Sequence, residues 1–188
     1  MNQIAKVLIA ALLLSGSSHL LAFGGRLAAN LLGNADFDQG LEDWTFNFSS
    51  AVTWVANYDA PPPGTHSLGA VALFQEDSES TNASQCVQVA PGQKYIASVW
   101  TIATCPTNAR IEIQWSIRPD CADGSFVGDE GMFSETSSYD WQIIQSTVIA
   151  PDTAQGALIS LENEGNCNEA VLFDGAFFGD RIFSNSFE

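Results

Sequence analysis

Basic residues are scarce in this sequence. Its 188 residues include 6 Lys and Arg against 22 Asp and Glu, which leaves a formal net charge of −16 at pH 7. Nucleic-acid binding depends on neutralising phosphates with Lys and Arg, and attachment to anionic lipid heads depends on the same residues. The composition therefore excludes a nucleic-acid protein of that kind, argues against docking on anionic membranes, and fits a self-repelling protein outside the cell.

Patterns of common catalytic sites are also missing. The sequence has no G-x-S-x-G elbow, no Walker loop and no G-x-G-x-x-G, and the histidine that follows the N-terminal segment, His66, stands near Pro-Gly in a predicted turn. Paired carboxylates could be formed by the many acidic residues, but no motif marks them. We therefore predict no catalysis. A small secreted hydrolase is the lesser alternative, and a buried carboxylate pair would favour it.

One long hydrophobic run is present, at the N-terminus. Lys6 precedes an apolar stretch over residues 7–14, a Ser-Gly-Ser-Ser break follows, and Ala22 offers a small residue for cleavage. Because a bilayer needs about 20 apolar residues, we predict a signal peptide over residues 1–22 and a short leader over 23–29. An uncleaved anchor, or cleavage after Ala28 or Ala29, is the alternative. The sequence thus predicts a secreted, periplasmic or extracellular protein without membrane insertion.

Cysteines are few and none belongs to a C-x-x-C pair. The four are Cys86, Cys105, Cys121 and Cys167. The spacing gives no support to a zinc ribbon or a thioredoxin-type motif. An even number in an exported chain favours two disulfides, for which the sequence alone allows three pairings.

Short runs of alternating polar and apolar residues follow Asn30. In residues 110–118, the apolar side chains take every second position, and Gly, Pro, Asn and Asp separate this run from the others. Period-two alternation with frequent turn residues is typical of an antiparallel β-sandwich. The other predicted strands cover residues 52–58, 84–90, 95–104, 141–150, 157–162 and 171–178. The acidic tracts 75–82 and 119–138 are predicted to be loops.

Four segments carry motifs in a definite order. The first runs from Asn30 to Trp44 and reads N-L-x-x-N-x-x-F-D-x-G-x-x-x-W. The others are residues 84–98 with Q-C-V, P-G and Y-x-x-S, the Tyr139-Asp140-Trp141 opening, and the Phe173-Asp174 strand over residues 171–178. Together they resemble jelly-roll carbohydrate-binding modules of the family 4, 9 and 22 type, with Asp38 in place of the usual glutamate. The resemblance covers residues 30–179, leaves 180–188 as a C-terminal tail, and implies an all-β antiparallel sandwich of jelly-roll (galactose-binding-like) topology.

The same resemblance implies a calcium site and a disulfide. In such modules an opening carboxylate and an aspartate of the final strand approach a structural calcium. Asp38 and Asp174 match those positions, and the Asp36 turn could add further oxygens. The alternative is that these aspartates cap turns. The Q-C-V and D-C cysteines of the relatives match Cys86 and Cys121, which implies that these two pair and that Cys105 pairs with Cys167.

A carbohydrate site needs aromatic faces for stacking and polar groups that bond to hydroxyls. Trp100 is the best stacking candidate because it alternates with the apparent core residues of its strand, and Trp54 and Tyr58 could line the same sheet. Glu112 and Gln114 point away from the apolar side of their strand. The alternative is that the sandwich buries its aromatics, and three of the tryptophans are expected to be structural: Trp44, Trp115 and Trp141.

We therefore predict a secreted, non-catalytic protein that binds a polysaccharide or oligosaccharide through exposed aromatics on one sheet. A structural or adhesive surface sandwich without a sugar site is the alternative from a different class. Aromatic side chains exposed together on one sheet would favour the first function, and burial of all of them would favour the second.

Overall fold

The computed structural model of the chain describes residues 29–57, 68–75, 80–103, 107–136, 140–164 and 170–180. The predicted signal peptide, most of the predicted leader and most of the C-terminal tail lie outside the described residues, as do Tyr58, His66, Cys105 and Cys167. Within the described ranges, no helix has the length and apolar character that crossing a membrane would require.

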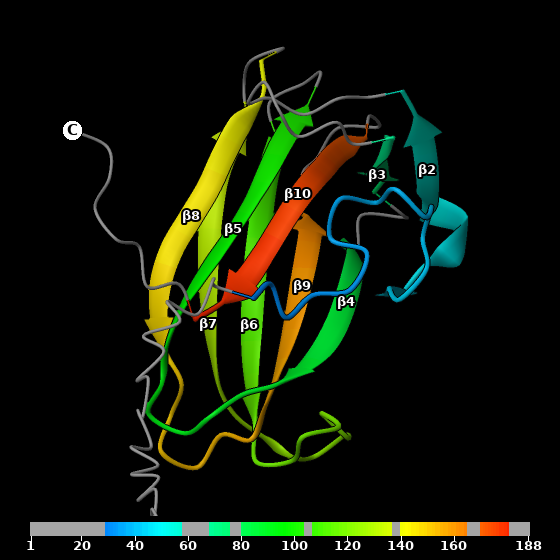
Figure 1. Cartoon of the computed structure of the whole chain (residues 1–188). Helices are drawn as coiled ribbons and strands as arrows, with labels where there is room; N and C mark the ends of the chain where they lie inside the picture. Colours follow the sequence, from blue (N-terminus) through cyan, green and yellow to red (C-terminus); the bar gives the residue numbers. More distant parts are fainter. Residues whose placement is uncertain are drawn as a thin grey trace, which may run out of the picture.

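Two antiparallel five-stranded sheets pack face to face (Figure 1). The strand order is β1-β4-β9-β6-β7 in the first sheet and β2-β3-β10-β5-β8 in the second, so strands far apart in the sequence are neighbours. This is the all-β jelly-roll sandwich that the sequence predicts. The strands are β1 (Thr45–Phe46), β2 (Val52–Ala56), β3 (Gly69–Leu73), β4 (Thr81–Gln88), β5 (Lys94–Ala103), β6 (Thr107–Ser116), β7 (Phe126–Thr136), β8 (Gln142–Ile149), β9 (Gly156–Asn163) and β10 (Val171–Gly179), with the 3-10 turn η1 (Ser49–Ala51) before β2.

The core lies between the two sheets, and the alternation within each strand fills it. On β6 every second residue is apolar, and Trp115 at the end of that row is only 1% exposed. Its indole lies 6.4 Å from the ring of Phe178 on β10, which in turn stacks on Tyr95 of β5 at 5.0 Å. Because side chains alternate between the faces of a strand, the residues between these core positions must point outward.

The opening motif forms an ordered loop beside β10, drawn in blue in Figure 1. Phe37 is fully buried and stacks on Trp44 at 5.2 Å. Asn34 adopts a left-handed backbone conformation, with φ of 42°, and its side-chain amide donates to the carbonyls of Gly40 and Glu42 at 3.0 Å each. Asparagine tolerates this conformation because its short side chain can bond locally, so the motif residues are those that hold the loop.

Three strands lie where the sequence predicts none: β3, β7 and the two-residue β1. Strand β7 occupies most of the tract 119–138 that was expected to be a loop. It is an edge strand that, within the described residues, pairs only with β6. Its acidic, glycine-containing sequence does not indicate a strand, and the hydrogen bonds to β6 are what hold it in an extended conformation. Strand β3 is buried at all five positions, so it lacks the polar–apolar alternation used to find strands.

Truncating Trp115 should weaken the whole sandwich. We expect Trp115→Ala to lower the free energy of unfolding by about 3–5 kcal/mol, because a fully buried tryptophan leaves a large cavity. Urea unfolding followed by circular dichroism measures the loss. Trp100→Ala is the matched control on a half-buried tryptophan, and equal losses in the two variants would contradict this account of the core.

Candidate functional site

The sandwich has two outward faces, one on each sheet. We define the Trp100 face by Ile96, Ser98, Trp100, Ile143 and Gln145, on β5 and β8 of the second sheet. We define the Arg110 face by Ser84, Arg110, Glu112, Gln114, Ser160 and Glu162, on β4, β6 and β9 of the first sheet. The strand register places each set on one side of its own sheet. Core packing places both sets on the side away from the other sheet.

Trp100 lies on the outward face of β5 and is half-buried. The residues that alternate with it, among them Val99, are buried in the main core. Ile143 of β8 is its direct cross-strand partner and is 46% exposed. The Trp100 face therefore offers a half-buried tryptophan beside an exposed aliphatic side chain, and the partly buried Trp141 lies on the same side of the sheet against Ile102 and Leu172.

Trp54 lies on the opposite side of the same sheet. Its indole nitrogen donates to the carbonyl of Phe37 at 2.8 Å, and a Cβ placed on Gly69 would lie 2.5 Å from that nitrogen. The side chain packs against the main core. The expectation that Trp54 and Trp100 line one face is wrong, because β2 begins with the buried Val52 and the period of two turns Trp54 inward with it. Tyr58, the third expected aromatic, lies outside the described residues.

Glu112 and Gln114 also lie apart from Trp100. They point outward from β6, between the buried residues Ile111, Ile113 and Trp115. Because β6 belongs to the first sheet, the whole core separates these two side chains from Trp100. The expected combination of one stacking tryptophan with these two polar groups is therefore not formed.

An arginine and three glutamates form the centre of the Arg110 face. Nη2 of Arg110 donates to Glu112 at 2.6 Å and Nη1 donates to Glu164 at 2.6 Å, while Glu162 lies 3.6 Å from Nη1. Gln114 donates to the second oxygen of Glu112 at 3.4 Å. The predicted residues Glu112 and Gln114 thus belong to a network whose central member, Arg110, was not among the expected site residues.

The floor of this face is polar and buried although it points away from the core. Ser160 and Glu162 on β9 are 3% and 6% exposed, and they alternate with the core residues Ile159 and Leu161. Outward residues of a sheet are ordinarily solvated. These two lie below the surrounding side chains, so the face holds polar groups that are partly removed from water.

Burial changes the acidity of Glu162. Desolvation, helped by the nearby charge of Glu112, raises the pKa of Glu162 to about 7, against the opposing effect of Arg110. Glu112 and Glu162 both contact Arg110, at 2.6 Å from Nη2 and 3.6 Å from Nη1. Catalytic carboxylates of glycosidases stand about 5 Å or more apart so that the sugar fits between them. Glu112 and Glu162 are a partly buried pair of neighbouring carboxyl groups, which is the feature that favours the hydrolase as the lesser alternative.

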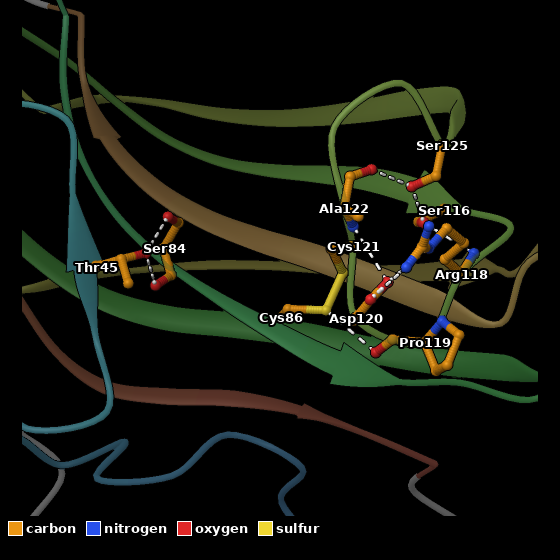
Figure 2. The surroundings of a disulfide bond; sticks show 10 residues. All are labelled: Thr45, Ser84, Cys86, Ser116, Arg118, Pro119, Asp120, Cys121, Ala122 and Ser125. Carbon is orange, nitrogen blue, oxygen red and sulfur yellow. Dashed lines mark hydrogen bonds and ion pairs between the residues drawn. A yellow bond between two sulfur atoms is a disulfide. The ribbon is translucent and has the colours of Figure 1, made fainter.

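A disulfide ties a loop to the end of the Arg110 face (Figure 2). Cys86 on β4 bonds to Cys121 with Cα atoms 5.9 Å apart, which is the pairing that the family resemblance implies. A Cβ on Gly156 of β9 would collide with the carbonyl oxygen of Arg118, so the loop backbone lies directly on the first residue of that strand. The side chains of Ser116 and Ser125 bond across the loop base at 2.6 Å, and the loop covers the sheet beyond Gln114.

The three aspartates of the expected calcium site lie near the opening loop and β10. Asp38 accepts from the backbone of Leu68, and the fully buried Asp174 accepts from Gly175 at 2.7 Å. Burial raises the pKa of Asp36, and so does the charge of Asp38. No group of three or more His, Cys, Asp and Glu residues gathers as a metal-ligand set in the described part of the chain. Two carboxylates with backbone carbonyls are the donor set that remains for calcium.

Comparison with solved structures places the fold among carbohydrate-binding modules. A family 16 carbohydrate-binding module is 18% identical over 79% of this chain and 99% of that chain, with a TM-score of 0.62. The module TmCBM61, solved in complex with β-1,4-galactotriose, is 18% identical over 81% and 99% of the two chains, with a TM-score of 0.58.

A larger protein contains the same fold. The enzymatically active domain of tailspike protein 4 from bacteriophage CBA120 is 15% identical over 80% of this chain, with a TM-score of 0.64. This chain spans only 21% of that tailspike chain. No protein family and no curated protein matches the sequence. At these identities, the likeness shows the jelly-roll fold and not the ligand.

The shifted acidity of Glu162 predicts how stability depends on pH. The pKa of Glu162 is raised from the usual value of 4.5 for a glutamate to about 7 in the folded protein. The folded protein therefore binds the proton more tightly, and stability is lost as the pH rises from about 4.5 to 7, by about 3 kcal/mol in all. We expect Glu162→Gln to remove this loss, as measured by urea unfolding across that pH range. Glu130→Gln, at an exposed position of β7, is the control, and an unchanged pH slope in Glu162→Gln would contradict the assignment.

Proposed function

We propose that this protein is a secreted, non-catalytic carbohydrate-binding protein whose Arg110 face bonds to the hydroxyls of a neutral glycan. The observation that carries the proposal is the buried polar floor formed by Ser160 and Glu162 on the outward side of β9. The jelly-roll fold, shared with solved carbohydrate-binding modules, supports the same function.

The chemistry of the face suits sugar hydroxyls. The three carboxyl groups around Arg110 provide several acceptor oxygens at fixed positions, and the amide of Gln114 and the hydroxyl of Ser84 add groups that can donate or accept. Groups already held by neighbours lose little freedom when a ligand binds, which reduces the entropic cost of association.

The charge of the face argues for an uncharged ligand. The guanidinium of Arg110 is already shared by three glutamates, and the protein carries a net charge of −16. A glycan with carboxylate or sulfate groups would be repelled. A neutral glycan meets no long-range field, so its affinity should change little with salt concentration.

Gln114 provides the test of this face. We expect Gln114→Ala to bind about ten-fold more weakly, because about 1.4 kcal/mol of hydrogen bonding is lost. The variant should stay folded, because this half-buried side chain lies outside the core. Affinity electrophoresis in β-1,4-galactan and in a panel of neutral and acidic polysaccharides makes the measurement. Trp100→Ala on the other sheet is the control and should bind like the wild type.

The Trp100 face is the second candidate for the sugar site. It carries a half-buried tryptophan beside the exposed Ile143, and an aromatic ring is the usual stacking surface for a sugar. If Trp100→Ala abolishes retention and Gln114→Ala does not, the sugar binds there instead. If the folded wild type is retained by no polysaccharide of the panel, the structural or adhesive alternative replaces both proposals.

We propose a structural calcium ion held by the carboxylates of Asp38 and Asp174, with backbone carbonyls of the Asp36 turn completing the ligand set. A ligand that binds only the native state stabilises it by mass action, and the buried carboxylate of Asp174 would gain a counter-charge. On protein loaded with calcium beforehand, excess chelator should therefore lower the melting temperature. An identical melting curve with and without chelator would exclude this site.

A further inference from the structure

Gly131 lies at the edge of the Arg110 face. It is directly opposite Glu112 in the pairing of β7 with β6. A Cβ on this residue would lie 2.9 Å from both Nε and Nη2 of Arg110, closer than real Cβ atoms approach such neighbours. Gly131 is not among the residues with positive φ, so its backbone does not need glycine. The space above Gly131 is therefore what glycine provides here.

The guanidinium of Arg110 uses this space. Arg110 is paired with Phe133 on β7, and the next pair on the same face is Glu112 with Gly131. The side chain of Arg110 therefore extends along the sheet from its own pair to the neighbouring one, where it reaches Gly131. In that position its two terminal nitrogens donate to different carboxylates, Glu112 and Glu164, both at 2.6 Å. Any side chain at position 131 would begin where the guanidinium now lies.

We propose that Gly131 is a positioning residue of the glycan-binding face, because its missing side chain lets Arg110 hold the carboxylates of Glu112 and Glu164 where sugar hydroxyls can reach them. The inference rests on the proposed function. Gly131 itself offers no side chain to a ligand and acts through Arg110 alone.

The acidity of Glu162 provides a readout that does not involve a glycan. The charged and titratable groups that face Glu162 from the described elements around it are Arg110 and Glu112 on β6 and Glu164 after β9, while Asn82 on β4 is uncharged. Of these, only Arg110 lowers the pKa of Glu162. Moving the guanidinium away must therefore raise this pKa further.

The experiment compares Gly131→Ala with Gly128→Ala on the same strand. A Cβ on Gly128 would meet no atom within 4 Å, so this control tests alanine on β7 without a collision. We expect Gly131→Ala to stay folded, to titrate Glu162 at a higher pH in carboxyl-carbon NMR, and to bind the polysaccharide that retains the wild type about ten-fold more weakly. Gly128→Ala should match the wild type in both measurements. β-1,4-galactotriose serves as the soluble probe in calorimetry.

Arg110→Lys tests whether Gly131 acts through Arg110. Lysine keeps the positive charge but has no Nε and no second terminal nitrogen, so adding Gly131→Ala to this variant should change neither readout further. Additive effects, an unchanged Glu162 titration in Gly131→Ala, or equal losses in both glycine variants would overturn the proposal. If no glycan retains the wild type, the proposed function fails and the glycan part of this inference fails with it. The Glu162 titration then still decides whether Gly131 positions Arg110.

Discussion

Burial of large apolar side chains between the two sheets is the interaction on which the rest of the molecule depends. Trp115, Phe173 and Phe178 fill the space between β6 and β10 almost without exposure. Because each strand alternates its side chains, this packing also decides which residues face outward. The Trp100 face and the Arg110 face are thus consequences of how the core is filled.

The Arg110 network shows how a sheet can carry buried charge on its outer side. Glu162 on β9 is nearly inaccessible, which would be unfavourable for an isolated carboxylate. Arg110 reduces this cost, and the raised pKa of Glu162, to which the charge of Glu112 contributes, is what remains of it. Glycine at position 131 leaves the space that Arg110 occupies, and the disulfide loop closes the end of the face.

The sequence predicted the strands well where polar and apolar residues alternate regularly. Strands β5, β6 and β9 follow the expected period of two. The opening motif forms the ordered loop around Phe37 and Trp44. Strand β7 was missed because its order comes from pairing with β6, and β3 because a strand buried on both faces does not alternate. The inward turn of Trp54 was missed because a period of two separates two faces without saying which one is inside.

The site was predictable only in part. Glu112 and Gln114 could be recognised as outward residues from the apolar side chains between them, and the Cys86–Cys121 pair from the family resemblance. Arg110 shares their face and gave the same local signal. Its importance comes from Glu162 and Glu164, more than fifty residues away in the chain. No local pattern could connect these residues.

The sequence by itself determined the fold class, the acidic character of the surface and the alternation within most strands, because these depend on composition and on neighbours two residues apart. Only the tertiary structure decided that Trp100 and Glu112 lie on opposite sides of the core, that Trp54 packs inward, and that Gly131 makes room for Arg110. Those relations depend on which strands become neighbours and on which side of each sheet meets the other. Both are settled by long-range packing of the whole chain.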